Sequence, residues 1–311
     1  MSQAALVSTS PGKARARTFA QQQQRFFWLL VSPVLIVLAI ITLLPMIYLL
    51  VVSLTPLNMT KPGSGADFSA PLANYAVLLT DTRLHDSLWT QLKLSVATVG
   101  LQLFFGLAVA LLLNKSSRLG ELVRTSLLIP MVLPPIVVAI IWKMIFSPDI
   151  SPLWGVFYWL GWHVPVPITD ARFALSAIVI ADTWEWFPFT MLIILSALSM
   201  MPEEYTESAQ IDGATAWQQT WYVTLPYLRG ALLVAGLFRL IDSIKAFPLI
   251  YLLTNGGPGT VTEVTNFYVF VQSFNFSFLG YSSAITVILV AIVCVLSWGI
   301  VRLVSGGERA E

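Results

Sequence analysis

Residues 26–54 read FFWLLVSPVLIVLAIITLLPMIYLLVVSL, an apolar run that contains no charged side chain. A helix needs about 20 such residues to cross the roughly 30 Å hydrocarbon core of a bilayer, because each residue rises about 1.5 Å. The run is therefore long enough to span a membrane. It begins well inside the chain and has no small-residue cleavage site, so we expect a retained helix and not a secretory signal.

Five more runs of this character follow along the chain, and with the first they predict six transmembrane helices. The expected spans are about 26–54, 92–113, 122–146, 173–200, 229–254 and 279–304. Only 11% of the 311 residues are charged and 57% are hydrophobic, whereas a soluble domain carries about 25% charged residues. Because hydrocarbon offers no water to a free backbone group, we expect the spans to be helical. The chain is predicted to be an all-α polytopic membrane protein.

The third run contains Pro130, Pro134 and Pro135. Proline lacks a backbone N–H, and its ring clashes with the preceding turn of a helix. We therefore expect this span to be bent.

Lysine and arginine in the loops predict the orientation, because cytoplasmic loops carry an excess of them. One side holds ten of these residues: Lys13, Arg15, Arg17, Arg25, Lys115, Arg118, Arg124, Arg229, Arg302 and Arg309. The other side holds Lys61, Arg83 and Arg172. Both termini are thus expected in the cytoplasm, with residues 1–25 and 305–311 as tails of the membrane domain 26–304.

Residues that build common catalytic and metal sites are scarce. Cys294 is the only cysteine, which excludes a disulfide or a thiolate metal cluster within the chain. His85 and His163 lie in predicted outer loops and have no metal-binding spacing. No phosphate-binding motif of the form G-x-x-x-x-G-K-[ST] occurs, and the net charge of +1 does not indicate nucleic acid. We expect no catalytic residue, metal or cofactor in this chain.

The predicted outer loop 147–172 carries Trp154, Trp159 and Trp162. Tryptophan is enriched at membrane–water interfaces, so these rings favour an anchor at the lipid headgroups. A surface on which sugars stack is the alternative.

The predicted inner loop 201–228, between spans four and five, begins with the signals of a short helix. Pro202 suits a first helical position, and Glu203 and Glu204 suit the positive end of a helix dipole. Gly213 can supply the left-handed conformation that commonly ends a helix.

A second short helix is expected from 214 to about 224, with Pro226 marking the approach to the next span. Two short helices joined at a glycine would form a projecting elbow. The elbow is acidic, opposite to the usual cytoplasmic bias, which favours a basic protein partner over lipid.

This segment resembles the EAA loop of permeases in bacterial binding-protein-dependent ABC importers. Residues at the family's spacing are Glu207-Ser208-Ala209, Gly213, Val223 and Leu225-Pro226, where Ser208 replaces the usual Ala and Val223 the usual Ile. The resemblance implies that the elbow docks into a cleft of a separate ATPase, with the glutamate paired to a basic residue there. The residues expected to take part are Glu203, Glu204, Glu207, Ala209, Asp212, Gly213, Leu225 and Pro226.

The resemblance extends over about 26–304. Within this range the chain is similar to the permeases of sugar importers, of the maltose and glycerol-phosphate type. It is carried by 129–135, 141–143, 184–189, 238–242 and 253–258, the last of which reads LTNGGP. Pro248 stands where many relatives carry an acidic residue, a departure that bears on local helix shape.

Charged side chains within the expected spans form a second group of candidates. A charge at the bilayer centre costs about 2.5–3.5 kcal/mol on insertion scales, so such residues pair or face a water-filled cavity. Arg239 and Asp242 are three residues apart and can pair on one helix face. We favour this pairing over direct contact with a substrate.

Glu185 is open to two interpretations that do not exclude each other. It can form an ion pair with Lys245 across two helices, or it can line a cavity between Trp184 and Trp186, where aromatic rings beside polar groups suit a sugar. The candidates for the substrate path are Asp182, Trp184, Glu185, Trp186, Arg239, Asp242 and Lys245.

The resemblance implies a type I ABC importer permease fold in the bacterial inner membrane. It also implies a second and non-identical permease, a pair of ATPase subunits that bind ATP and Mg, and a soluble binding protein that holds most of the specificity. Membrane lipid surrounds the spans, and the expected cargo is a sugar or sugar-like solute moved by alternating access. Which sugar is carried is not specified by these residues.

A proton-coupled secondary transporter is the alternative. Asp182, Glu185 and Asp242 could relay protons. The acidic elbow would then have no explanation. An intramembrane enzyme is a weaker alternative still, because paired metal ligands, a Ser-His constellation and a lipid-phosphate motif are lacking.

Overall fold

The computed structural model describes residues 12–114, 118–162 and 164–307, and at 12–22, 25 and 303–307 it describes the backbone alone. Helices and connecting turns make up this part of the chain, without a strand. In chain order the helices are α1 (Gly12–Ser53), η1 (Ser64–Ala66), α2 (Ala73–Leu78), α3 (Thr82–Leu113), α4 (Arg118–Leu127), α5 (Ile129–Val132), α6 (Pro135–Phe146), α7 (Pro152–Trp159), η2 (Pro167–Thr169), α8 (Ala174–Ser199), α9 (Glu203–Ile211), α10 (Ala216–Gln219), η3 (Thr220–Thr224), α11 (Leu225–Ile244), α12 (Pro248–Leu253), α13 (Thr265–Phe270), η4 (Val271–Asn275) and α14 (Leu279–Gly307).

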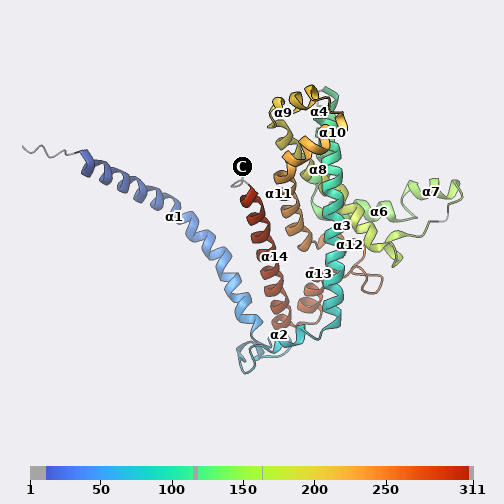
Figure 1. The fold of residues 1–311 in the computed structure, drawn as a ribbon. Helices are drawn as coiled ribbons and strands as arrows, with labels where there is room; N and C mark the ends of the chain where they lie inside the picture. The colour runs from blue at the N-terminus through green and yellow to red at the C-terminus, as the bar shows by residue number, and fades with distance from the viewer. Residues whose placement is uncertain (1–11, 115–117, 163, 308–311) are drawn as a thin grey trace, which may run out of the picture.

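Five helices of the described chain are long and apolar enough to cross a membrane: Phe26–Ser53, Thr82–Leu113, Ala174–Ser199, Ala216–Ile244 and Leu279–Arg302. The remaining expected span is a bent pair, Arg118–Val132 followed by Pro135–Phe146, that counts as a sixth if the pair crosses once. This confirms the predicted all-α polytopic membrane protein. Short helices α9, α10 and α4 gather at one end of the bundle, and α2 lies at the other (Figure 1).

The prediction of a bend in the third run is confirmed, since its two halves meet at 99°. The bend falls at Leu133 and Pro134, which both have extended backbone, with ψ of 141° and 137°. A proline pushes the residue before it out of the helical region, and here two prolines stand in a row. The second half, α6, then packs against α8 and α12.

The fifth run differs from the single span expected over 229–254. One continuous helix runs from Ala216 to Ile244, through Pro226, and then stops. The chain turns at 245–247 before α12 begins at Pro248. Pro248 cannot donate to the preceding turn and excludes helical backbone at Phe247, where φ is −143°.

Six of the ten basic residues used for orientation, Lys13, Arg15, Arg17, Arg25, Lys115 and Arg309, lie outside the described side chains, as does His163. Arg118 and Arg124 lie on α4, at the end of the bundle that also carries α9 and α10 (Figure 1). The cytoplasmic position of the termini stays a prediction.

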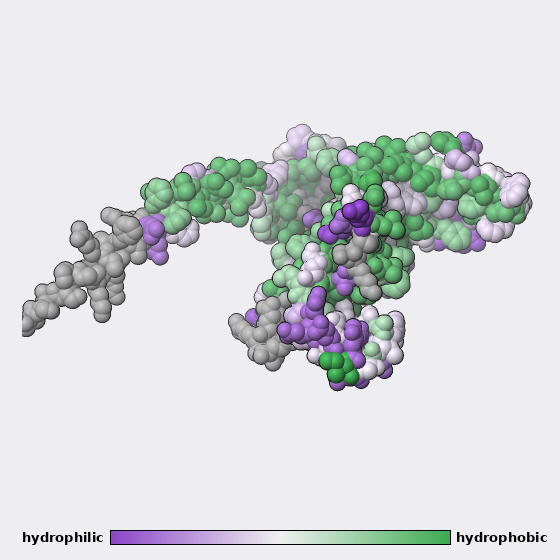
Figure 2. All heavy atoms as spheres, turned by 90° about the horizontal axis from the view of Figure 1, so that it is seen from above, coloured by the Kyte–Doolittle hydropathy of each residue, from purple (hydrophilic) through white to green (hydrophobic). Residues whose placement is uncertain are grey.

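The first helix stands apart from the others over most of its length (Figure 1). No residue in its most apolar window is buried. Seen from the end that carries α9 and α10, hydrophilic residues gather on the bundle, while α1 is apolar over most of its length and hydrophilic near its described start (Figure 2). A helix that is apolar all round is stable only when lipid or another protein covers it.

Trp154 does not belong to an exposed aromatic belt. Its ring is buried, and its Nε1 donates to the carbonyl of Ile145 at 3.2 Å. Trp159 and Trp162 are exposed, so the two alternatives for this loop apply to them alone.

A stripe of polar side chains joins α3 to the centre of the bundle. Gln91, Ser95, Thr98 and Gln102 recur at helical spacing, lie on one face and are buried. Gln91 donates to the carbonyl of Ser243, and the hydroxyls of Ser95 and Ser243 lie 2.8 Å apart. Buried polar groups need such partners, which positions α3 against α11.

Gly106 lies on α3 where this helix packs directly against α8. A Cβ at this glycine would lie 2.0 Å from Thr190 Oγ1 and 2.9 Å from the backbone nitrogen of Met191. Small residues allow membrane helices to approach this closely. The glycine is therefore required by packing.

Gly106→Ala is expected to destabilise the permease by about 1–3 kcal/mol, because the two helices must separate to admit the methyl group. Gly100→Ala, on the same helix and with no atom within 4 Å of a built Cβ, is the matched control and should not lower stability. The thermal unfolding midpoint of both variants in detergent measures the difference. Equal midpoints for the two variants would contradict the packing argument.

Candidate functional site

Two features of the described chain are candidates for function: the elbow formed by α9 and α10, and a pocket near the middle of the bundle. Helix α9 spans Glu203–Ile211, with Glu203 and Glu204 in its first turn. Pro202 was expected at the first helical position, but it is the N-cap, with extended backbone at ψ 135°. The helix thus begins one residue later than predicted.

Gly213 ends α9 in the left-handed conformation that the sequence predicted, with φ at 78°. The backbone N–H of Gly213 donates to the carbonyl of Gln210, and that of Ala214 donates to the carbonyl of Ala209. This pair of bonds is the Schellman motif, which satisfies carbonyls that a helix end leaves free.

The second helix of the elbow begins at Ala216, two residues after the expected 214. Thr215 and Gln218 form a capping box: the backbone nitrogen of Gln218 donates to the Thr215 hydroxyl, and the Gln218 side chain accepts from the Thr215 backbone. This reciprocal bonding favours a helix start at Ala216. From there helical backbone continues without a break into α11.

The expected coupling residues divide into an exposed and an inner set. Glu203, Glu204, Glu207, Asp212, Gly213 and Pro226 are exposed, whereas Ala209 is buried and Leu225 half-buried. Exposed apolar side chains lie among the acidic ones: Ile211 is 86% exposed and Trp217 72%. Sequence reasoning missed these two, although apolar residues in a polar loop were a usable signal.

The second feature is built around Arg239, which is only 1% exposed. Its Nε donates to Gln102 Oε1 at 2.8 Å, and its Nη1 donates to Asp242 Oδ2 at 3.3 Å. Its Nη2 lies 3.7 Å from Asp182 Oδ2, and the Trp186 ring lies 4.5 Å from the guanidinium carbon. The predicted pairing of Arg239 with Asp242 is present, and it is one part of a larger network.

Gln102 is the residue of this network that sequence reasoning missed. Its amide oxygen accepts from Arg239, and its Nε2 donates to Asp182 Oδ2 at 2.7 Å. The polar stripe on α3 was a signal that could have found it. Through Gln102 the buried charges of α8 and α11 are joined to α3.

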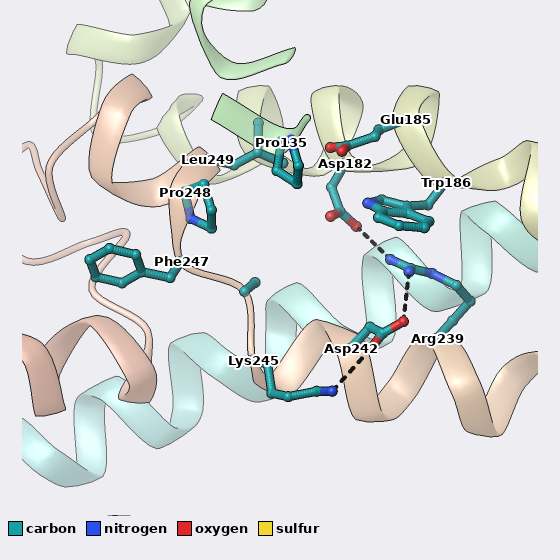
Figure 3. Close-up of a pocket in the computed structure, with 11 residues that line it drawn as sticks. Pro135, Asp182, Glu185, Trp186, Arg239, Asp242, Lys245, Phe247, Pro248 and Leu249 are labelled. Atoms are coloured by element: carbon teal, nitrogen blue, oxygen red, sulfur yellow. Dashed lines mark hydrogen bonds and ion pairs between the residues drawn. The ribbon is translucent and has the colours of Figure 1, made fainter. Parts of the chain in front are cut away.

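Six of the seven substrate-path candidates line one pocket of about 240 Å³, which we call the central pocket (Figure 3). They are Asp182, Glu185, Trp186, Arg239, Asp242 and Lys245. Pro135, at the bend before α6, and Pro248, at the start of α12, also line it. The two interruptions of the membrane helices therefore meet here, and interrupted backbone at membrane depth is tolerated where it lines a cavity.

Trp184 is the candidate that lies elsewhere. Its ring packs edge-on against Trp142, with centroids 5.9 Å apart, in the apolar core beside α6. It positions α6 against α8 and does not line the central pocket.

Glu185 does not pair with Lys245, which corrects one of the two interpretations. Lys245 Nζ lies 3.3 Å from Asp242 Oδ1 and is 65% exposed. The reason is that α11 ends at Ile244, so Lys245 stands in the turn next to Asp242 and water. Within the described chain, neither carboxyl oxygen of Glu185 makes a hydrogen bond, although the residue is fully buried.

Known proteins resemble this chain over most of its length. Residues 102–308 match the family model described as binding-protein-dependent transport system inner membrane component. A probable ABC transporter permease protein of Sinorhizobium fredii is 34% identical over 277 residues, which covers 89% of each chain. The trehalose transport system permease protein SugA of Mycobacterium tuberculosis is 30% identical over 291 residues, 92% of each.

A further relative is the trehalose/maltose transport system permease protein MalF of Thermococcus litoralis, 31% identical over 302 residues, 93% of this chain and 96% of that one. A solved bacterial alginate ABC transporter, in complex with a periplasmic protein bound to alginate pentasaccharide, contains a chain of the same fold. Its TM-score is 0.78 at 19% identity, over 90% of this chain and 93% of that chain. These likenesses support the importer over a proton-coupled transporter. This chain therefore belongs to the family of binding-protein-dependent transport system inner membrane components and is a multi-pass permease subunit of an ABC importer.

Proposed function

We propose that this permease carries a sugar or sugar-like solute, received from a soluble binding protein, into the cell by alternating access. The names of several relatives support a carbohydrate cargo: trehalose, maltose, sulfoquinovosyl glycerol and starch degradation products. The observation that carries the proposal is the Glu185 carboxyl group, which is buried in the central pocket without a hydrogen-bond partner in the described chain.

A buried carboxyl group without a partner is costly, and proteins retain such groups where a function requires them. Hydroxyl groups of a sugar can donate to both oxygens of Glu185, and the ring of Trp186 offers an apolar face beside them. Binding of a solute would then satisfy the group that folding leaves unsatisfied.

The size of the central pocket suggests that this chain supplies only part of the solute site. Pockets that enclose small molecules measure about 300–1,000 Å³, and this pocket measures about 240 Å³. A second, non-identical permease facing it would complete the site. The binding protein would contribute most of the selection before the solute reaches the membrane.

The elbow is proposed to lie in the cytoplasm and to dock into a basic cleft of one subunit of an ATPase dimer, which binds ATP and Mg. Its exposed carboxylates Glu203, Glu204, Glu207 and Asp212 supply negative charge, and Ile211 and Trp217 supply apolar contact. In protein complexes, charged residues at the edge of an interface speed association with the partner, and aromatic residues buried at its centre contribute most of the binding free energy.

A single helix can transmit movement of the elbow to the central pocket. The 29 residues from Ala216 to Ile244 form continuous helix, about 44 Å long at 1.5 Å per residue. Arg239 lies near its far end and is bonded to Gln102 on α3 and associated with Asp182 on α8. A push on the elbow would therefore shift the pocket wall formed by α11 against the walls formed by α3 and α8.

Glu185→Gln tests the solute site. We expect uptake to fall about fivefold to tenfold, because an amide group replaces one of the two acceptor oxygens and a lost hydrogen bond costs about 1–1.5 kcal/mol. Stability should change little, since neither carboxyl oxygen makes a hydrogen bond in the described chain and the amide has nearly the same shape. Uptake of ¹⁴C-labelled trehalose and maltose by cells that express the whole transport system is the measurement, together with the unfolding midpoint of the purified variant.

Asp149→Asn is the matched control, because Asp149 is an exposed acidic residue that does not line the central pocket. It should transport as the wild type does. Wild-type uptake by Glu185→Gln, or a lower unfolding midpoint without loss of uptake, would contradict the assignment of Glu185.

A further inference from the structure

A second pocket lies between α12, α13 and the first turn of α3, toward the end of the bundle that carries α2 (Figure 1). It measures about 420 Å³, within the range of about 300–1,000 Å³ of small-molecule sites. Four aromatic rings line it, those of Tyr251, Phe267, Phe270 and Phe276. We call it the outer pocket.

Polar groups share the outer pocket with these rings. Asn255 and Asn275 line it and are exposed, so their amides are available to a ligand. Arg83 also lines it and donates from Nε and Nη2 to both carboxyl oxygens of Glu263, at 2.8 and 2.7 Å. The bidentate pair holds the start of α3 to the loop before α13 and leaves Arg83 Nη1 without a hydrogen bond in the described chain.

A continuous series of aromatic rings connects the outer pocket with the central pocket. Phe247 lines the central pocket and stacks on Tyr251, with ring centroids 5.4 Å apart and planes at 19°. Phe247 also contacts Phe267 and Phe270, at 6.0 and 5.0 Å. Tyr251 and Phe270, which both contact the Phe247 ring, line the outer pocket, so rings in direct contact border the two pockets. Phe267 is only 3% exposed and belongs to the core.

We propose that the outer pocket is a second saccharide site of the permease, and that the rings from Phe270 to Phe247 carry the solute between it and the central pocket. The proposal rests on the carbohydrate import proposed above. Aromatic faces cover the apolar faces of a sugar ring, and the two amides and Arg83 bond its hydroxyl groups. Such a series of rings holds a sugar at each step without a deep free-energy minimum, because each contact is weak.

Lipid does not account for this surface. Arg83 and Glu263 form a charged pair at this pocket, and charged side chains are rare on surfaces that face hydrocarbon. A contact with the second permease is the remaining alternative occupant. The amides and charged pair at the pocket argue against it, since the buried centre of a stable subunit interface is depleted of charged residues.

Phe270→Ala tests the outer pocket in the assembled transporter. The half-saturating concentration of loaded binding protein should rise about fivefold, as expected for loss of one aromatic contact, while the maximal uptake rate stays within about twofold. Phe270→Tyr keeps the ring and should restore the wild-type value. Asn275→Ala removes an exposed amide without removing a ring, and it should also raise the half-saturating concentration.

Phe278→Ala is the control, because this exposed ring lines neither pocket and makes no ring contact in the described chain. Uptake of ¹⁴C-labelled trehalose and maltose is measured in proteoliposomes, with size exclusion to show that the permeases remain together. If the wild type takes up sugar and both Phe270→Ala and Asn275→Ala keep its half-saturating concentration, the outer pocket is not a saccharide site. The proposed carbohydrate import would be unaffected by that result. Separation of the permeases in Phe270→Ala would assign the surface to a subunit contact and also overturn it. A wild type that takes up none of the solutes named for the relatives (trehalose, maltose, sulfoquinovosyl glycerol and starch degradation products) would contradict the carbohydrate assignment and this site together.

Discussion

Gly213→Pro is expected to abolish solute uptake while the permease is still inserted and folded in the membrane. Gly213 has φ at 78°, and its N–H donates to the carbonyl of Gln210. Proline holds φ near −65° and has no N–H, so the turn between α9 and α10 cannot form, at a cost of about 3 kcal/mol or more. The buried core should be spared, because Ala209 is the only buried residue of α9.

The measurements are uptake, the ATPase rate of the assembled transporter, and the amount of permease in the membrane. ATP hydrolysis should no longer be linked to transport. Gly213→Asn is the matched control, because asparagine adopts the left-handed conformation at small cost and a Cβ here meets no atom within 4 Å. Glu207→Ala should also uncouple hydrolysis from uptake without changing the backbone. Wild-type uptake in both Gly213→Pro and Glu207→Ala would refute docking of the elbow.

Arg239→Met is expected to destabilise the folded permease by about 3–5 kcal/mol, since removal of one partner leaves a buried charge uncompensated. Asp182 would lose its cation, and Gln102 Oε1 would lose its donor. Methionine retains an unbranched apolar chain of similar length, so the loss of charge is the main change. The unfolding midpoint in detergent and the yield of monodisperse protein measure the effect.

The double variant Arg239→Met/Asp182→Asn is expected to recover much of this loss, because no buried charge then lacks a partner and the substituted asparagine side chain can still accept from Gln102. Asp242 keeps Lys245 as its ion-pair partner in both variants. A double variant no more stable than Arg239→Met alone would show that the Arg239–Asp182 interaction is not what stabilises the network.

The elbow was largely predictable because its signals act over short distances in the chain. Gly213 ends a helix by its own backbone preference, and the acidic first turn of α9 agrees with the helix dipole. The start of α9 was predicted at Pro202, one residue too early. A proline can be either the first residue of a helix or the residue before it, so the sequence did not distinguish the two.

The sequence predicted which residues line the central pocket, but it did not predict which of them bond to each other. Charges in apolar runs stand out in any sequence, which is why six of the seven candidates line one pocket. Their partners depend on the depth and direction of each helix. Thus Glu185 has no hydrogen-bond partner in the described chain, Lys245 pairs with Asp242, and Gln102 on α3 bonds both Arg239 and Asp182.

By itself, the sequence determined that this chain is a polytopic helical membrane protein, that the third run bends at its prolines, and that an elbow turns at Gly213. These properties follow from local apolar length and backbone preference. Only the tertiary structure decided that the breaks at Pro135 and Pro248 meet at one pocket and that aromatic rings of α12 and α13 connect it with another. The reason is that such contacts join residues distant in the chain, and side-chain packing between helices sets them.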